Sequence, residues 1–78
     1  MKEIRQQKKQ PEVIRKRILE QATILVSQKG ISGVSIQNIA TAVGITKGGV
    51  FHHFPNKKNL IEEMFNQIIL GVVARANY

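Results

Sequence analysis

Hydrophobic residues recur at intervals of three and four along most of the chain, which is the spacing of one face of an α-helix. The first series begins at Ile14 and ends at Leu25. Pro11 suits the first turn of a helix, and Gly30 is a common residue at a helix end. This series therefore predicts a helix over residues 12–28. The chain shows no alternation typical of a β-strand.

Two shorter apolar series follow in the middle of the chain. Ser35 can cap a helix over residues 36–43, because an N-cap side-chain oxygen accepts a hydrogen bond from a free backbone N–H. Thr46 can cap a second helix over residues 47–53 in the same way. Gly44, between them, can take the left-handed conformation that ends a helix. We therefore expect one helix to stop and another to start within four residues.

A longer fourth series begins after Pro55, which disfavours a helical conformation at the residue before it. Asn56 can cap this helix, and its apolar residues form two rows, Leu60-Met64-Ile68-Val72 and Ile61-Phe65-Ile69. The later members of both rows extend beyond what a small core needs. Exposed apolar surface of that extent usually marks an interface.

The segment over residues 35–54 fits a helix-turn-helix motif. Such a motif needs a small residue where two helices approach, a glycine in the turn, and apolar anchors beneath both helices. Ala40 and Gly44 occupy the first two positions, and the anchors are Ile39, Val43, Ile45 and Val50. An ordinary corner in a helical bundle would use the same positions. We predict an all-α fold, a three-helix bundle with a helix-turn-helix that is followed by the start of a longer fourth helix.

The distribution of charge favours nucleic acid as the partner. The 78 residues contain 12 Lys+Arg and 5 Asp+Glu, a formal net charge of +7. Residues 1–29 hold eight Lys and Arg against three Glu, and residues 35–58 hold three Lys and no acid. A concentration of one charge sign on a small domain attracts polyanions, more weakly as salt rises. A merely solubilising surface would leave the acid-free middle segment unexplained.

Several other classes of protein are excluded by what the sequence lacks. Without cysteine, and with its two histidines adjacent and pointing about 100° apart on a helix, the chain offers no metal site. It has no nucleophile–base arrangement and no phosphate-cradling loop, so we expect neither an enzyme nor a cofactor. The longest apolar stretch, residues 68–74, is shorter than the roughly 20 residues of a membrane span. We expect a cytoplasmic protein.

Four segments together resemble the N-terminal domain of the TetR (tetracycline-repressor-like) transcriptional regulators. They are Ser35-Ile36-x-x-Ile39-Ala40, Val43-Gly44-Ile45-Thr46-Lys47-Gly48, Val50-Phe51-His52-His53-Phe54 and Asn56-Lys57-x-x-Leu60. The resemblance runs from about Arg17 to Phe65. It implies a homeodomain-like fold and the sequence-specific DNA-binding head of a bacterial regulator, with residues 47–53 in the major groove.

The resemblance also implies roles for individual residues. Lys47 stands at a base-reading position and can donate to guanine or to phosphate. His52 can meet a base or the sugar-phosphate edge, or stand idle in solvent. Phe51 replaces the usual tyrosine and offers only apolar contact, whereas His53 and Lys57 match phosphate contacts. The full set of predicted DNA-binding residues is Ser35, Thr46, Lys47, Gly48, Gly49, Phe51, His52, His53 and Lys57.

Two further positions depart from the family pattern. Gly49 stands where Thr, Ser or Ala is common, and together with Gly48 it should leave the second helix of the motif poorly ordered without DNA. Asn38 replaces the usual acid three residues after the Ser35 cap, which should weaken the reciprocal capping box.

The predicted organisation has three parts. Residues 1–10 form a flexible basic arm, which either follows the minor groove and backbone or only aids solubility. Residues 11–56 form the DNA-binding domain, in which Arg15, Lys16 and Arg17 should face phosphates. By resemblance, residues 57–78 connect to an absent C-terminal domain that dimerises and binds a small-molecule inducer, in a repressor of a palindromic operator. The alternative is a helical protein–protein interaction module that lacks DNA specificity.

Overall fold

The computed structural model of the protein describes residues 11–76 and, within them, side chains as far as residue 71. This region contains four helices and no strand: α2 (Pro11–Lys29), α3 (Ile36–Val43), α4 (Lys47–His53) and α5 (Lys57–Ala76). The all-α prediction is confirmed, and each helix begins within one residue of the position that the sequence indicates.

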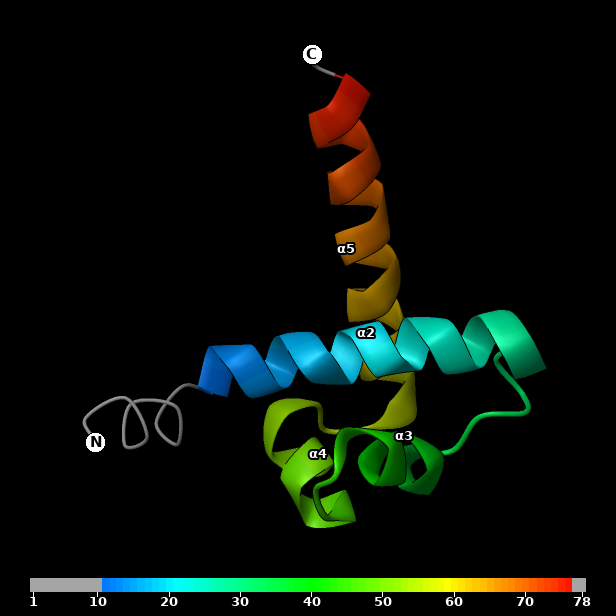
Figure 1. The fold of residues 1–78 in the computed structure, drawn as a ribbon, viewed down its shortest axis with the longest axis vertical. Helices are drawn as coiled ribbons and strands as arrows, with labels where there is room; N and C mark the ends of the chain where they lie inside the picture. The colour runs from blue at the N-terminus through cyan, green and yellow to red at the C-terminus, as the bar shows by residue number, and fades with distance from the viewer. Residues whose placement is uncertain (1–10, 77–78) are drawn as a thin grey trace.

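The helices pack around α2, which crosses the molecule as a long rod (Figure 1). Helices α3 and α4 lie together on one side of α2. Helix α5 begins on that same side, passes α2 and projects well beyond it. The two short helices of the motif are therefore supported from behind by the two long ones.

The hydrophobic core lies where the four helices meet. Fully buried side chains come from every helix and from the α4–α5 turn, and they include Ile18, Ala22, Ile39, Ala40, Val50, Phe54 and Leu60. Burying one large aliphatic or aromatic side chain contributes roughly 1.5–3 kcal/mol. No polar or charged side chain in the described part of the chain is buried. The core is thus held together by apolar contacts.

The turn between α3 and α4 has the predicted geometry. Gly44 has a φ of +90° in the left-handed region, where a side chain would be strained. Its N–H donates to the carbonyl of Ala40 at 2.9 Å, and the N–H of Ile45 donates to the same oxygen at 3.0 Å. Thr46 then caps α4 by accepting a hydrogen bond from the N–H of Gly49 at 3.0 Å.

The start of α3 differs from the expectation of a weakened cap. The hydroxyl of Ser35 accepts from the N–H of Asn38 at 3.0 Å, and the Asn38 Oδ1 accepts from the N–H of Ser35 at 3.0 Å. Both bonds of the capping box are therefore present. The amide oxygen of Asn38 accepts the bond that a carboxylate would accept, without the negative charge.

The connection from α2 to α3 depends on two glycines. Gly30 has a φ of +79° and donates its N–H to the carbonyl of Val26 at 2.8 Å, which ends α2. Gly33 lies so close to the end of α2 that an added Cβ would stand 2.6 Å from the backbone oxygen of Lys29. The loop that delivers Ser35 to its place is therefore tightly constrained.

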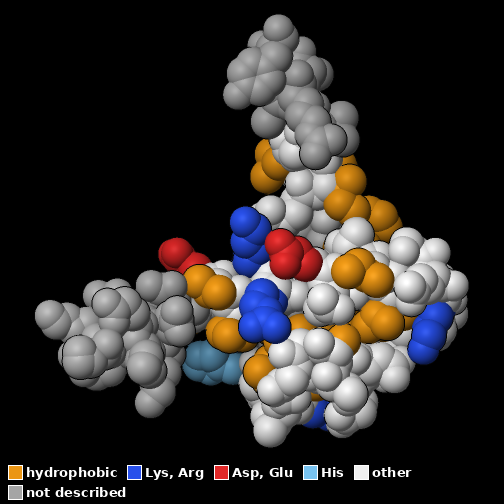
Figure 2. Space-filling model, viewed as in Figure 1, with side chains coloured by type: hydrophobic (Ala, Val, Ile, Leu, Met, Phe, Trp, Pro, Cys, Tyr) orange, Lys and Arg blue, Asp and Glu red, His pale blue; other side chains and the backbone are white. Residues whose placement is uncertain are grey.

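Helix α5 carries apolar side chains outside the core. Figure 2 shows hydrophobic side chains on the surface of this helix, and the most exposed of them are Phe65 (43%), Ile68 (42%), Ile69 (57%) and Leu70 (63%). Among the described residues no helix has both the length and the apolar character needed to cross a membrane.

Two glycine-to-alanine substitutions should have opposite effects on stability. Gly33→Ala should lower the free energy of unfolding by about 1–3 kcal/mol, because the Lys29 carbonyl must move away from the new methyl group. Gly71→Ala should raise it by roughly 0.5–1 kcal/mol, because Gly71 lies in a helix with nothing within 4 Å of its Cβ position. Urea unfolding followed by circular dichroism measures both, and equal effects would contradict the close approach.

Candidate nucleic-acid interface

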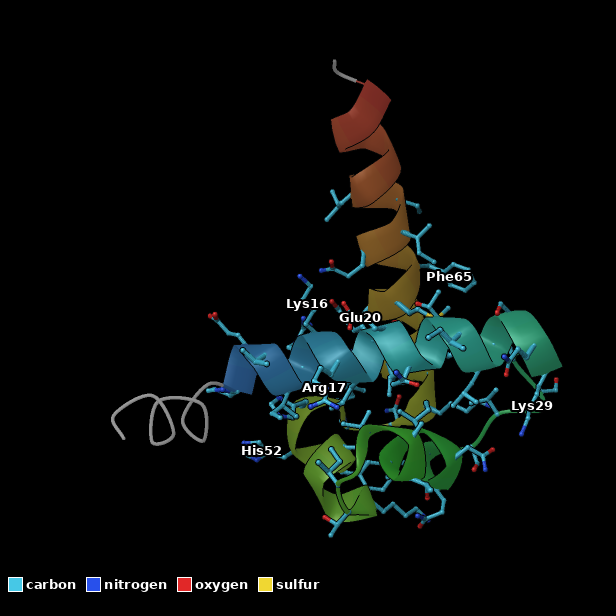
Figure 3. All side chains as sticks on the ribbon, in the orientation of Figure 1. Lys16, Arg17, Glu20, Lys29, His52 and Phe65 are labelled. Carbon is cyan, nitrogen blue, oxygen red and sulfur yellow. The ribbon has the colours of Figure 1, made fainter. Side chains whose placement is uncertain are left out.

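Helix α4 presents most of its surface to solvent. Val50 is fully buried and anchors the helix, while Lys47, Gly48, Phe51 and His52 are exposed. Residues four apart lie on the same face of a helix, so Lys47 and Phe51 form one exposed pair. His52, labelled in Figure 3, points outward from α4. The helix therefore offers a cation, an aromatic ring and an imidazole to a partner.

A shallow groove brings four of the predicted residues together. It is lined by Ser35 at the start of α3, Lys47 and Phe51 on α4, and Lys57 at the start of α5. Neighbouring polar side chains that line the same groove are Ser32, Gln37 and Asn56. The sequence did not predict a DNA contact for any of these three, although their hydrogen-bonding groups suit phosphate or base edges. The other predicted residues do not line this groove.

The two capping hydroxyls retain a free donor. Ser35 and Thr46 each use an oxygen lone pair to accept from a backbone N–H of their own helix. A hydroxyl group has one O–H donor and two acceptor lone pairs, so each can still donate to a phosphate oxygen. Both residues are exposed. Capping and DNA contact are therefore compatible at both positions.

The adjacent glycines of α4 are not required by packing within the chain. An added Cβ at Gly48 would meet only the Thr46 hydroxyl oxygen, at 3.8 Å. At Gly49 the nearest atoms would be the Ile45 Cδ1 and the Thr46 oxygen, both at 3.4 Å, which is an ordinary contact distance. The space beside both glycines would accept a methyl group without a severe clash.

His53 sits at the end of α4 in a partly buried position. Its pKa is lowered below 6.5 by burial first, then by the neighbouring His52, whose ring centre is 5.1 Å away, and by the Arg15 guanidinium. The lowered pKa favours the neutral form of the ring near pH 7. A neutral imidazole still carries one N–H, so His53 can donate a hydrogen bond to phosphate without carrying a charge.

Arg15 does not face outward as predicted. Its guanidinium donates to the Glu63 carboxylate at 3.0 Å and lies over the Phe54 ring, 5.0 Å from the ring centre. The expectation that Arg15 has no acidic partner and is free to face phosphates is wrong, because it pairs with an acid that lies 48 residues further along the chain. Figure 3 shows Arg17 on the side of α2 toward α4 and Lys16 toward the projecting part of α5.

The predicted basic arm, residues 1–10, lies outside the described residues, as do the last two residues of the chain. The interface described here therefore consists of α4 with the starts of α3 and α5. Residues 35–58, which contain this interface, hold three Lys and no acid.

Taken together, the fold and this surface define a helix-turn-helix DNA-binding domain, in which the second helix of the motif stands free to enter a groove. Comparison with known families agrees, because residues 18–64 match the family described as bacterial regulatory proteins, tetR family. The chain belongs to the tetR family. Its function is that of a transcriptional regulator's DNA-binding domain, and the family is not one of enzymes.

Curated relatives support the same assignment. The chain is similar to the HTH-type transcriptional regulator AcrR of Shigella flexneri, with 38% identity over 61 residues, covering 78% of this chain and 28% of AcrR. It is 37% identical to the transposon Tn10 TetC protein of Escherichia coli over 57 residues, covering 73% of this chain and 29% of TetC.

A third relative is the biofilm operon icaADBC HTH-type negative transcriptional regulator IcaR of Staphylococcus aureus strain Newman. It is 32% identical over 69 residues, covering 80% of this chain and 37% of IcaR. The chain thus spans about a third of the length of the curated relatives that it matches. No solved structure matches the chain significantly.

The lowered pKa of His53 should make the domain less stable in acid. The folded state binds the His53 proton more weakly than the unfolded state does. The contribution of neutral His53 to the free energy of unfolding is therefore fully present above the ordinary pKa of 6.5 and is lost as the pH falls through the folded pKa. His53→Gln should reduce the loss in unfolding free energy between pH 7.5 and pH 5.5. Urea titrations at both values test this, and identical losses in the two proteins would contradict it.

Proposed function

We propose that the chain binds double-stranded DNA by inserting α4 into the major groove. The observation that carries this proposal is the groove in which Ser35, Lys47, Phe51 and Lys57 meet beside an exposed α4. A major groove about 12 Å wide accepts one helix, and the flanking helix starts then lie against the two phosphate backbones.

Each predicted residue has a proposed role in this complex. Lys47 donates to guanine or to phosphate at the start of α4, and Phe51 contacts a thymine methyl group or a sugar. His52 faces a base or the sugar-phosphate edge, and Gly48 and Gly49 let the helix backbone approach closely. The phosphates are held by Lys57, by the neutral N–H of His53, and by the hydroxyls of Ser35 and Thr46.

The function of a longer protein that contains this domain is also a proposal. IcaR is named a negative regulator, and the curated relatives extend far beyond the matched region. We propose that residues 57–78 lead into a C-terminal domain that dimerises and binds a small inducer in the cytoplasm. Two heads would then occupy the two halves of a palindromic operator, and the inducer would cause release. One head alone contacts one half-site and binds weakly.

A second candidate function is protein–protein interaction through α5. The exposed Phe65, Ile68, Ile69 and Leu70 favour it, because side chains of this size on one helix usually meet a partner. Binding through such a surface resists high salt, in contrast to binding through lysines and phosphates. Salt dependence therefore distinguishes the two functions.

Two lysine variants should affect DNA binding differently. Lys57→Ala should weaken binding to every duplex similarly, because a phosphate contact carries no sequence information. Lys47→Ala should cost about 1–3 kcal/mol and also relax the preference at one or two base pairs. Fluorescence anisotropy with a panel of single-substitution duplexes measures both effects.

Lys16→Ala is the matched control for those variants. It removes the same charge on the side of α2 toward the projecting part of α5, away from α4 (Figure 3), and should change affinity least. Identical profiles for Lys47→Ala and Lys57→Ala would remove Lys47 as a reader of bases.

Affinity for any duplex should fall steeply with salt. If Lys47, Lys57 and Arg17 each neutralise one phosphate, a slope of about −0.9 per contact predicts roughly 40-fold weaker binding at 200 mM than at 50 mM salt. Anisotropy titrations across this range test the expectation. A flat response would favour the α5 interaction surface instead.

A further inference from the structure

Arg15 connects three separate parts of the fold. It projects from α2, forms an ion pair with Glu63 of α5 at 3.0 Å, and places its guanidinium carbon 5.0 Å from the centre of the Phe54 ring. Among the described residues this is the only ion pair. The side chain is about two-thirds screened from solvent, so both contacts form in a partly desolvated position.

Phe54 is the residue that ends α4. It is fully buried, and its N–H donates to the carbonyl of Val50 at 2.9 Å, which closes the last turn of the helix. Its ring therefore fixes where the C-terminal end of α4 lies in the core. A group that holds this ring and Glu63 at once also fixes α4 relative to α5.

The chemistry of the contact favours arginine over lysine. A guanidinium is planar, so it can lie against an aromatic ring with one face and donate to a carboxylate with its edge. An ammonium group has neither the flat face nor the fork of donors. The two contacts of Arg15 thus depend on the shape of the group as well as on its charge.

We infer that Arg15 is a positioning residue for DNA binding: by holding Phe54 and Glu63 together it sets the place of α4 against α5, without touching DNA. This inference rests on the proposed DNA-binding function. It assigns to Arg15 a role unlike that of Arg17, which is exposed and lies on the α4 side of the same helix.

The first test uses two glutamate variants with the same change in charge. Glu63→Gln removes the negative charge that pairs with Arg15, and Glu62→Gln removes an exposed carboxylate from the neighbouring position on α5. The probes are a duplex selected from a random-sequence library by the unmodified chain, and a shuffled duplex of the same length.

For Glu63→Gln, an effect of net charge alone and an effect on the position of α4 predict opposite changes in DNA binding. Removal of an acid raises the net charge, which should strengthen binding to both duplexes slightly, and Glu62→Gln should behave in this way. If Arg15 positions α4, Glu63→Gln should instead weaken binding to the selected duplex about twofold to fivefold, the range expected for a partly exposed ion pair. Its binding to the shuffled duplex should not fall.

The second test keeps the charge and changes the shape. Arg15→Lys should lower the preference for the selected duplex, whereas Lys16→Arg, which also exchanges one cation for the other, should leave that preference unchanged because Lys16 lies on the side of α2 toward the projecting part of α5. Circular dichroism melting of all four variants identifies any loss of affinity that follows from unfolding.

A third measurement, made in the absence of DNA, uses the pKa of His53 to report the position of the Arg15 guanidinium. Burial and the neighbouring His52 contribute most to the lowered pKa of His53, and the Arg15 guanidinium contributes least of the three. Arg15→Met should therefore raise that pKa slightly, and Glu63→Gln should lower it, because loss of the carboxylate leaves the guanidinium charge uncompensated. Proton-detected titration of the imidazole signals reads both shifts, and a general loosening of the core would not produce opposite signs.

The possible failures are distinguishable. If the unmodified chain shows no preference for any selected duplex, the proposed function fails and the inference fails with it. If the unmodified chain does show a preference but Glu63→Gln behaves like Glu62→Gln, only the positioning role is overturned. Shifts of the His53 pKa with the same sign in Arg15→Met and Glu63→Gln would indicate a loosened core and would likewise overturn that role.

Discussion

The burial of a few apolar side chains beneath α4 is the constraint on which the rest of the structure depends. A helix of seven residues with two glycines has too little hydrogen bonding to form by itself in water. Val50 and Phe54, both fully buried, attach it to a core built mainly by α2, α3 and α5. Because those two residues hold the helix from one side, its other faces are free for a partner. The same contact that makes α4 possible therefore also exposes its functional side chains.

The polar features of the domain follow from that arrangement. Backbone groups at the helix ends are satisfied by Ser35, Thr46 and Asn56, which are neutral side chains. The acids of the described region lie on α2 and α5, and Glu63 is paired with Arg15. Positive charge is thus left unopposed around the groove that contains Lys47 and Lys57. Membership of the tetR family and the exposed surface of α4 indicate independently that this is a DNA-binding domain.

The sequence predicts this fold well because its signals are local. Helical periodicity, the glycine at residue 44 and the cap at Thr46 act within a few residues, and the structure contains all of them. What sequence reasoning missed acts over distance: the Arg15–Glu63 pair spans 48 residues, and the lowered pKa of His53 comes mainly from burial. Within the candidate interface, Ser35, Lys47, Phe51 and Lys57 lie together. The place of Gln37 and Asn56 in the same groove follows only from the fold, in which three helix starts converge. The roles of all these residues toward DNA remain predictions.

The neutral helix starts have a consequence for how this domain can change. No acidic residue occupies the first turn of α3, α4 or α5, whereas α2 has Glu12 in that position. An aspartate at such a position would interact favourably with the helix dipole, and it would also repel a phosphate backbone. The easiest gains in heat resistance are therefore concentrated on the face that must stay attractive to polyanions. Selection for thermal stability alone would place acidic residues first in these helix starts. The resulting domain would be more stable but would repel DNA.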